Sequence, residues 1–228
     1  MPDVIVRWVD ECLERMREDF RSAPSFFFTE NDLVCHLFYL LMQKQNLLLA
    51  TDLGGQRHML VHTEYPMPFR CDMGDHRFKI KRDDELTSDG KTYRRGHYDM
   101  AVLNPSAVKS HMYEDINGQD FKRFKGRVIE GGSESFPIIL YGLDFIFKRD
   151  MISESGVRSF SKSVYQDCEK IRRSKNPMTS GFEHLNGFMG KGKVLVFVRS
   201  PEDERTVEAL ESILDAEDIL LSVGAARE

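Results

Sequence analysis

The spacing of apolar residues in the first fifth of the chain predicts two helices. Between residues 3 and 20, apolar side chains recur every three or four positions, at Ile5, Val9, Cys12, Leu13, Met16 and Phe20. The segment Ala23-Pro24-Ser25 interrupts this pattern, and a second helix is expected from Thr29 to about Asn46. Thr29 is a suitable N-cap, and Asp32, three positions later, can complete a capping box.

Strand patterns dominate the rest of the chain. Apolar segments at 58–65, 96–103, 137–148 and 193–199 predict four strands, and 219–223 predicts a short fifth. Pro66 and Pro68 are expected to end the first strand, and Asn104-Pro105 the second. The segment 193–199 is nearly all apolar, which is typical of a strand buried on both faces. Helices are expected at 159–174 and after Ser200-Pro201.

This order of elements predicts one α/β domain across residues 1–228. The expected core is a mixed sheet of four to five strands with helices on both sides. Two polar segments poor in apolar residues, 69–95 and 106–136, are expected to be insertions into that core.

Composition narrows the functional classes. The net charge of -5 argues against a global basic field for nucleic acid, although local clusters of Lys and Arg are present. The four cysteines and seven histidines lack the spacing of a zinc site. No apolar run approaches the roughly 20 residues that span a bilayer, and the N-terminus has no signal pattern. A cytoplasmic protein without membrane association is therefore expected.

Two aspartates stand inside apolar strands. Asp99 lies in Arg95–Val102, and Asp144 lies in Pro137–Lys148. A buried carboxylate costs several kcal/mol unless something compensates its charge. If the two strands pair, strand alternation allows both carboxylates to lie side by side on one face. A divalent cation would neutralise both, and oxygen ligands favour Mg²⁺ or Mn²⁺.

Three further side chains can join such a site. Glu30, at the start of the second helix, can reach it if that helix crosses the strands, and Glu64 is another candidate ligand. Lys148 shares the strand face of Asp144, where a cation can stabilise charge that develops on a phosphate. Each has an ordinary alternative: a first-turn acid favoured by the helix dipole for Glu30, a surface acid for Glu64, and a strand-end lysine reaching solvent for Lys148.

These residues together resemble the PD-(D/E)XK nuclease superfamily, which has the restriction-endonuclease-like fold. The resemblance covers about residues 26 to 199. Glu30 resembles the glutamate of the family's first helix, Asp99 the metal-binding aspartate, and Asp144 the acid of the acid-x-Lys motif. The run from Tyr165 to Lys170 resembles the helix that follows this motif.

The motif is degenerate at its lysine. The resemblance requires Lys at position 146, where this chain has Ile146. Lys148 lies two residues further along the same face, roughly 6 to 7 Å away, and is the candidate replacement.

The resemblance implies a metal-dependent endonuclease that hydrolyses DNA. Asp99, Asp144 and Glu30 would hold Mg²⁺ or Mn²⁺, and Lys148 would complete the catalytic set. DNA is the expected partner, and a homodimer stays open. Ile146 favours an alternative, a non-catalytic protein of the same fold that binds nucleic acid or a partner protein. A third reading, favoured by the acidic pI, is a structural or regulatory α/β protein.

Overall fold

A mixed five-stranded sheet organises the chain. The structure, a computed structural model, describes residues 2–72, 93–110, 137–150, 152–175, 189–199 and 219–223. The sheet has the order β3-β4-β5-β6-β7, and a separate sheet pairs β1 with β2. β3 and β4 are antiparallel, whereas β6 and β7 are parallel. The predicted α/β class with a mixed sheet is therefore confirmed.

The element bounds complete this description. The described helices are α1 (Pro2–Ser22), α2 (Glu30–Met42), α3 (Pro105–Lys109) and α6 (Glu154–Lys175), with short 3-10 helices η1 (Pro24–Phe26) and η2 (Gln45–Leu48). The strands are β1 (Leu49–Thr51), β2 (Arg57–Met59), β3 (Val61–Asp72), β4 (Tyr93–Leu103), β5 (Ile139–Lys148), β6 (Met189–Val198) and β7 (Ile219–Val223).

The chain divides into two compact units, and β5 and β6 each contribute to both. The first unit comprises Met1–Leu48, Leu143–Ile171 and Gly192–Glu228. The second comprises Leu49–Gly142 and Arg172–Lys191.

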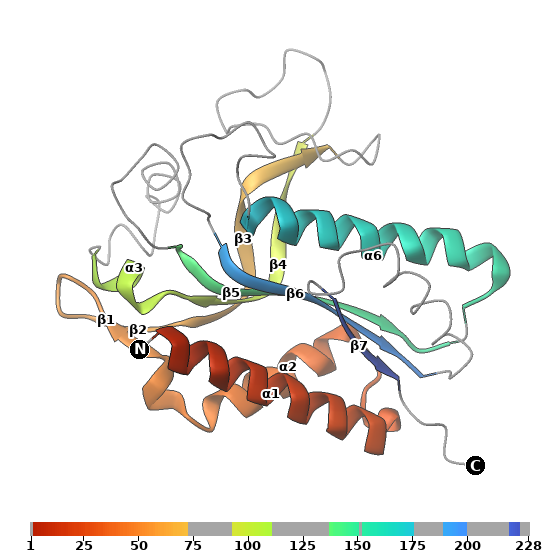
Figure 1. Cartoon of the computed structure of the whole chain (residues 1–228), viewed down its shortest axis with the longest axis horizontal. Helices are drawn as coiled ribbons and strands as arrows, with labels where there is room; N and C mark the ends of the chain where they lie inside the picture. Colours follow the sequence, from red (N-terminus) through yellow and green to blue (C-terminus); the bar gives the residue numbers. More distant parts are fainter. Residues whose placement is uncertain are drawn as a thin grey trace. The chain divides into compact units, whose positions relative to one another are not determined.

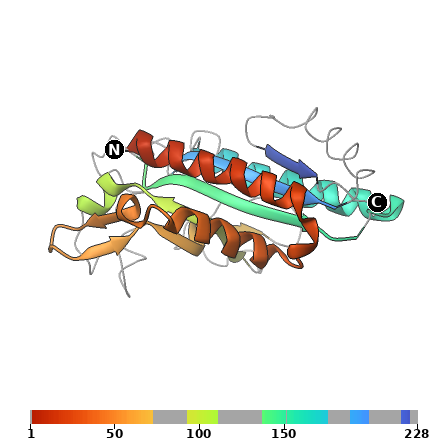
Figure 2. The same ribbon diagram turned by 90° about the horizontal axis from the view of Figure 1, so that it is seen from below.

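In the first unit, helices cover both faces of the strands. Figures 1 and 2 show α1 and α2 on one side of β5 and β6, and α6 on the other. Phe20 of α1 is fully buried in the first of these layers. Its ring contacts Phe27, Phe147 of β5 and Phe197 of β6, with centroid separations of 5.6, 6.1 and 4.9 Å. This aromatic cluster fastens α1 to the sheet.

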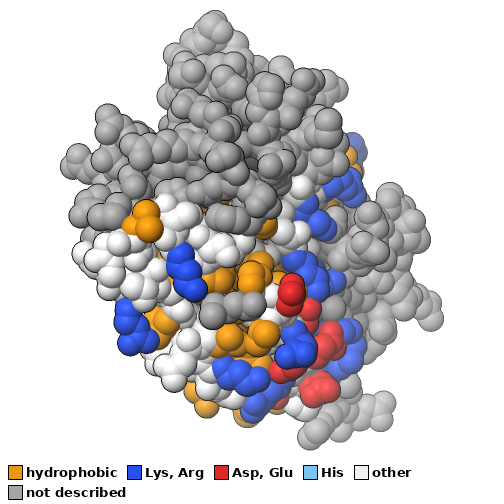
Figure 3. Space-filling view, turned by 60° about the vertical axis from the view of Figure 1, so that its left-hand side comes forward, with side chains coloured by type: hydrophobic (Ala, Val, Ile, Leu, Met, Phe, Trp, Pro, Cys, Tyr) orange, Lys and Arg blue, Asp and Glu red, His pale blue; other side chains and the backbone are white. Residues whose placement is uncertain are grey.

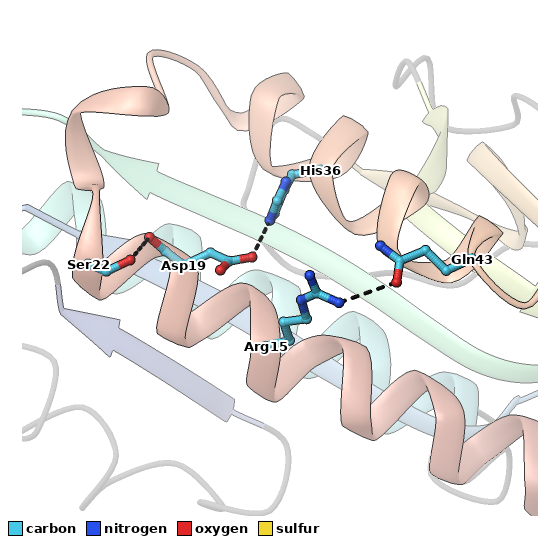
Figure 4. A network of polar contacts seen from close by, with 5 residues as sticks. All are labelled: Arg15, Asp19, Ser22, His36 and Gln43. Atoms are coloured by element: carbon cyan, nitrogen blue, oxygen red, sulfur yellow. Dashed lines mark hydrogen bonds and ion pairs between the residues drawn. The ribbon is translucent and has the colours of Figure 1, made fainter.

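Polar contacts join α1 to α2. The six predicted apolar positions of α1 are all buried, as expected. Above them, the indole of Trp8 donates to the carbonyl of Leu41 at 3.2 Å. Figure 4 shows two further links, from Arg15 to Gln43 at 3.2 Å and between Asp19 and His36 at 2.8 Å.

The predicted capping box at the start of α2 is confirmed. The Thr29 hydroxyl accepts from the backbone N–H of Asp32, and the Asp32 carboxylate accepts from the N–H groups of Thr29 at 2.8 Å and Phe28 at 2.7 Å. The bonds from Phe28 and Thr29 lower the pKa of Asp32 below 3.8. The helix ends at Met42, before the expected Asn46.

One prediction about the sheet was wrong, because the prolines do not end the strand. β3 runs through Pro66 and Pro68 to Asp72, and the ladder with β4 shifts register between Pro66 and Arg70. β3 is an edge strand, where proline is tolerated because one side of the strand needs no ladder donors.

Other boundaries also moved. The predicted strand 58–65 is divided between β2 and β3, and α6 begins at Glu154 rather than 159. The ends of the predicted insertions belong to β3, β4 and α3, whereas 73–92 and 111–136 lie outside the described residues. The helix expected after Pro201 also lies outside them, and the short strand at 219–223 is confirmed as β7.

In the second unit, a buried acid closes the β1–β2 hairpin. Asp52 accepts from the backbone N–H of Gln56 at 2.8 Å and contacts the ring of His58 at 2.9 Å. Burial raises the pKa of Asp52, but the bonds from His58 and Gln56 outweigh that effect and hold it below its usual value. Gly55, with φ of 84°, supplies the left-handed turn.

Replacing Phe20 by alanine is expected to destabilise the fold strongly. The change removes a fully buried ring that contacts three other aromatic rings, so the free energy of unfolding should fall by about 3 to 5 kcal/mol. Phe26→Ala is the matched control, since this ring is 77% exposed and its loss should change stability by less than about 0.5 kcal/mol. Urea unfolding measures both, and similar losses in the two variants would contradict this packing.

The capping box should make stability depend on acid pH. Because the folded-state pKa of Asp32 is lowered, its carboxylate stabilises the fold above the unfolded-state pKa, and this effect is lost as pH falls through the folded value. The difference in melting temperature between wild type and Asp32→Asn should stay constant from pH 7 to about 5, then narrow. A difference that persists unchanged at pH 3 would exclude this role.

Candidate functional site

A buried ion pair joins β5 to α6. The Nζ atom of Lys170 lies 2.6 Å from Oδ1 of Asp144 and 3.3 Å from Oδ1 of Asp167. The Asp144 side chain is 1% exposed, Lys170 is 12% exposed and Asp167 is 27% exposed. Asp167 is therefore the member of this cluster most open to solvent.

Strand alternation and helix spacing bring these side chains together. On β5, Phe147 and Asp144 have opposite parity, so Asp144 faces α6 while Phe147 faces α1. On α6, Phe160, Val164, Cys168 and Ile171 form the buried stripe. Lys170 lies beside that stripe. Asp167 precedes Lys170 by three positions, the spacing of neighbours on a helix surface.

The ammonium of Lys170 compensates for the hydration that the Asp144 carboxylate loses on burial. A carboxylate removed from water loses several kcal/mol of hydration unless a partner compensates it. A close ammonium supplies that compensation, and loss of one member of such a pair is far more costly than loss of an exposed one. The cation that the structure places against Asp144 is the ammonium of Lys170.

Lys148 and Glu30 lie at a different place. Both line a surface pocket of about 490 Å³ at the end of β5, together with Phe28, Thr29, Asn31, Phe147, Arg149 and Asp150. Glu30 is exposed, and its carboxylate accepts from the backbone N–H of Phe147 at 3.4 Å. Glu30 and Lys148 therefore line one pocket, whereas Asp144 pairs with Lys170. The helices that carry Glu30 and Lys170 cover opposite faces of the strands.

Arg199 shapes this pocket from the end of β6. Its guanidinium donates to the carbonyl of Phe27 and lies over the rings of Phe28 and Phe147, at 5.9 and 5.5 Å. Its backbone N–H donates to the carbonyl of Lys148 at 3.3 Å. These contacts hold the start of α2 against the strand end, which accounts for the proximity of Glu30 and Lys148.

Asp99 lies on β4, which neighbours β5 in the sheet order. Its side chain is half-buried. Thr63 pairs with Met100 and Tyr65 with Tyr98, so Glu64 and Asp99 occupy the positions between these two pairs. Glu64 is exposed and has φ of 51°, a left-handed conformation that costs a non-glycine residue about 1 to 3 kcal/mol. Glu64 is therefore the residue of β3 at the level of Asp99 in this ladder.

The acidic residues of the described chain could supply one or two carboxylates to a metal ion, but not a larger set of protein ligands. Within the described part of the chain, no group of three or more His, Cys, Asp or Glu side chains is arranged to hold a metal ion. Mg²⁺ is nevertheless often bound by one or two carboxylates, with water and phosphate completing its shell. Asp99, Glu64 and Asp144 are carboxylates of the type that this cation prefers.

Surface charge adds little to this picture. In the coloured part of the face drawn in Figure 3, apolar side chains are bordered by both basic and acidic ones. Among the described helices, none is long and apolar enough to cross a membrane.

Comparisons with known protein families, with curated proteins and with solved structures found no match. The assignment of a function therefore depends on the geometry of the site itself.

The pair Asp144–Lys170 predicts unequal roles for two lysines. Lys170→Met should lower the free energy of unfolding by about 3 kcal/mol, because it leaves the buried carboxylate without its ammonium. Lys148→Met should change it by less than about 0.5 kcal/mol. Urea unfolding of these two variants, of Asp144→Asn and of the double variant Asp144→Asn/Lys170→Met tests this. The double variant should lose less than the two single losses added together, and strict additivity would sink the pairing.

Proposed function

We propose that this protein is a metal-dependent endonuclease that hydrolyses DNA, with a restriction-endonuclease-like core. The observation that carries the proposal is the pair formed by the strand acid Asp144 and the helix lysine Lys170. The chain also carries, in this order, Glu30 on a helix, Asp99 on β4 and Asp144 on β5, followed by helix α6 and strand β6, which is the order on which the resemblance is based.

Lys170 supplies the lysine that position 146 lacks. Ile146 is 8% exposed within β5, and Lys148 lies four residues beyond Asp144, roughly 13 Å along the strand. Lys170 reaches Asp144 from the neighbouring helix instead, at 2.6 Å. Its ammonium orients the carboxylate and can stabilise negative charge that develops on a phosphate beside it.

In this proposal Asp144 and Asp99 are the residues that would hold Mg²⁺ or Mn²⁺, as the sequence-based assignment has them. The ion, when bound, would polarise the phosphate and activate a water molecule. Asp167, the most exposed member of the cluster, would direct Lys170 and mark the side from which a substrate approaches. Glu30 stays a sequence-based prediction as a ligand.

The burial of Asp144 favours a second candidate. A carboxylate that is 1% exposed and already neutralised by Lys170 is also what a non-catalytic protein of the same fold would carry. Such a protein would bind nucleic acid or a partner protein without cleaving either.

Cleavage of DNA by the purified chain separates these candidates. Plasmid and linear DNA should be cut with Mg²⁺ or Mn²⁺ and not with EDTA. Asp144→Asn should abolish cleavage while retaining a hydrogen bond to Lys170, and Lys170→Arg should slow it at least tenfold, because a guanidinium cannot reproduce a compact ammonium.

Lys148→Met is the matched control for Lys170. A rate close to wild type is expected, since Lys148 lines a different pocket. A loss confined to Lys148→Met would restore the original sequence-based assignment. Protein that binds DNA and never cleaves it with either metal would support the non-catalytic candidate.

A further inference from the structure

A second pocket, which shares no residue with the cluster of Asp144, Asp167 and Lys170, lies between α1, η1 and α2. It has a volume of about 550 Å³ and is lined by Asp19, Ser22, Ala23, Phe26, Phe27, Asp32, Cys35 and His36. We propose that this pocket binds a basic side chain, arginine or lysine, presented by an apolar segment of a partner protein.

The charge of the pocket favours a cation. Two of its lining residues are carboxylates, Asp19 and Asp32, and none is lysine or arginine. His36 contacts one oxygen of Asp19 at 2.8 Å, as Figure 4 shows, and the two backbone N–H groups of the capping box use one oxygen of Asp32. Among the described residues, the second oxygen of each carboxylate has no hydrogen-bond partner, so each can accept from an incoming donor.

The walls of the pocket suit the stem and the planar head of such a side chain. Phe27 is buried beneath the pocket and contacts the ring of His36 in an edge-on arrangement at 5.4 Å. Phe26 is 77% exposed and stands at the rim. A cation beside an aromatic face is attracted by the ring, and the aliphatic stem of arginine or lysine packs against apolar walls.

The surroundings of the pocket indicate a protein segment rather than a free small cation. After its first turn, from Leu33 to Met42, α2 has no Asp, Glu, Lys or Arg. Its titratable side chains there are Cys35, His36 and Tyr39. Two members of its outer face, Cys35 and Tyr39, are exposed and one helical turn apart. Exposed aromatic residues beside an anchoring pocket are typical of protein interfaces, in which arginine is a frequent anchor.

Peptide binding to the full chain tests the proposal. The probe is a fluorescein-labelled five-residue peptide with a central arginine between phenylalanine and leucine, and its control has citrulline, which is neutral and nearly isosteric, in place of arginine. Fluorescence anisotropy should show binding of the arginine peptide at least tenfold tighter than that of the citrulline peptide.

Variants locate the binding. Asp19→Asn, which keeps a partner for His36, and Phe26→Ala should each weaken binding about tenfold, or 1.4 kcal/mol. Glu18→Gln removes a neighbouring exposed acid of α1 that does not line the pocket, and Leu53→Ala removes an exposed apolar side chain elsewhere. These two matched controls should bind as wild type does.

Four results would overturn the proposal. The first is equal binding of the arginine and citrulline peptides, and the second is an equal effect of Asp19→Asn and Glu18→Gln. The third is binding of arginine amide as tightly as the arginine peptide, which would make this a site for a free cation. The fourth is a sedimentation experiment that shows a dimer dissolved by Phe26→Ala, which would make a second copy of the chain the occupant.

Discussion

The need to neutralise one buried carboxylate constrains the first unit more than any other contact. Asp144 stands within a strand whose first eight residues are all buried, so its charge requires a cation close at hand. Lys170 meets that need only if α6 is rotated with this lysine toward β5. That rotation also directs Val164, Cys168 and Ile171 inward, so the ion pair and the apolar stripe favour the same orientation of the helix.

The two faces of β5 are consequently held by different forces. On one face, a charge pair joins the strand to α6; on the other, an edge-on cluster of aromatic rings joins it to α1. Aromatic packing tolerates small sliding, whereas the charge-assisted hydrogen bond within a 2.6 Å ion pair has a narrow range of distance and angle. The α6 side is thus the better place for chemistry that needs atoms fixed to within a fraction of an ångström.

Local signals in the sequence predicted local structure well. The spacing of Ile5 to Phe20 gave the buried face of α1, and Thr29 with Asp32 identified the start of α2, since both depend on residues within one or two turns. The pairing of Asp144 with Lys170 was not predictable in the same way. The two residues are separated by 26 positions, and their contact depends on how a helix rotates over a sheet. Lys148, on the same strand, was the lysine that strand parity alone could relate to Asp144.

The same distinction explains the misplaced end of β3. Pro66 and Pro68 are strong local signals for an end, but their effect depends on whether a neighbour needs the missing N–H groups. At the edge of the sheet, a shift in register absorbs them, and the strand continues. Sequence reasoning also could not relate the level of Glu64 to that of Asp99, because this depends on the register of β3 against β4.

Those prolines have a further consequence for how the molecule behaves in a crowded solution. An open strand edge is a template on which another chain can add a strand, and long, regular edges promote fibrous or domain-swapped assemblies. β3 has twelve residues, which is long for an edge, but two of its residues lack the N–H that a docking strand would need, and its ladder is irregular over the same stretch. The feature that misled the sequence-based boundary therefore protects the protein from growth of its sheet into neighbouring molecules.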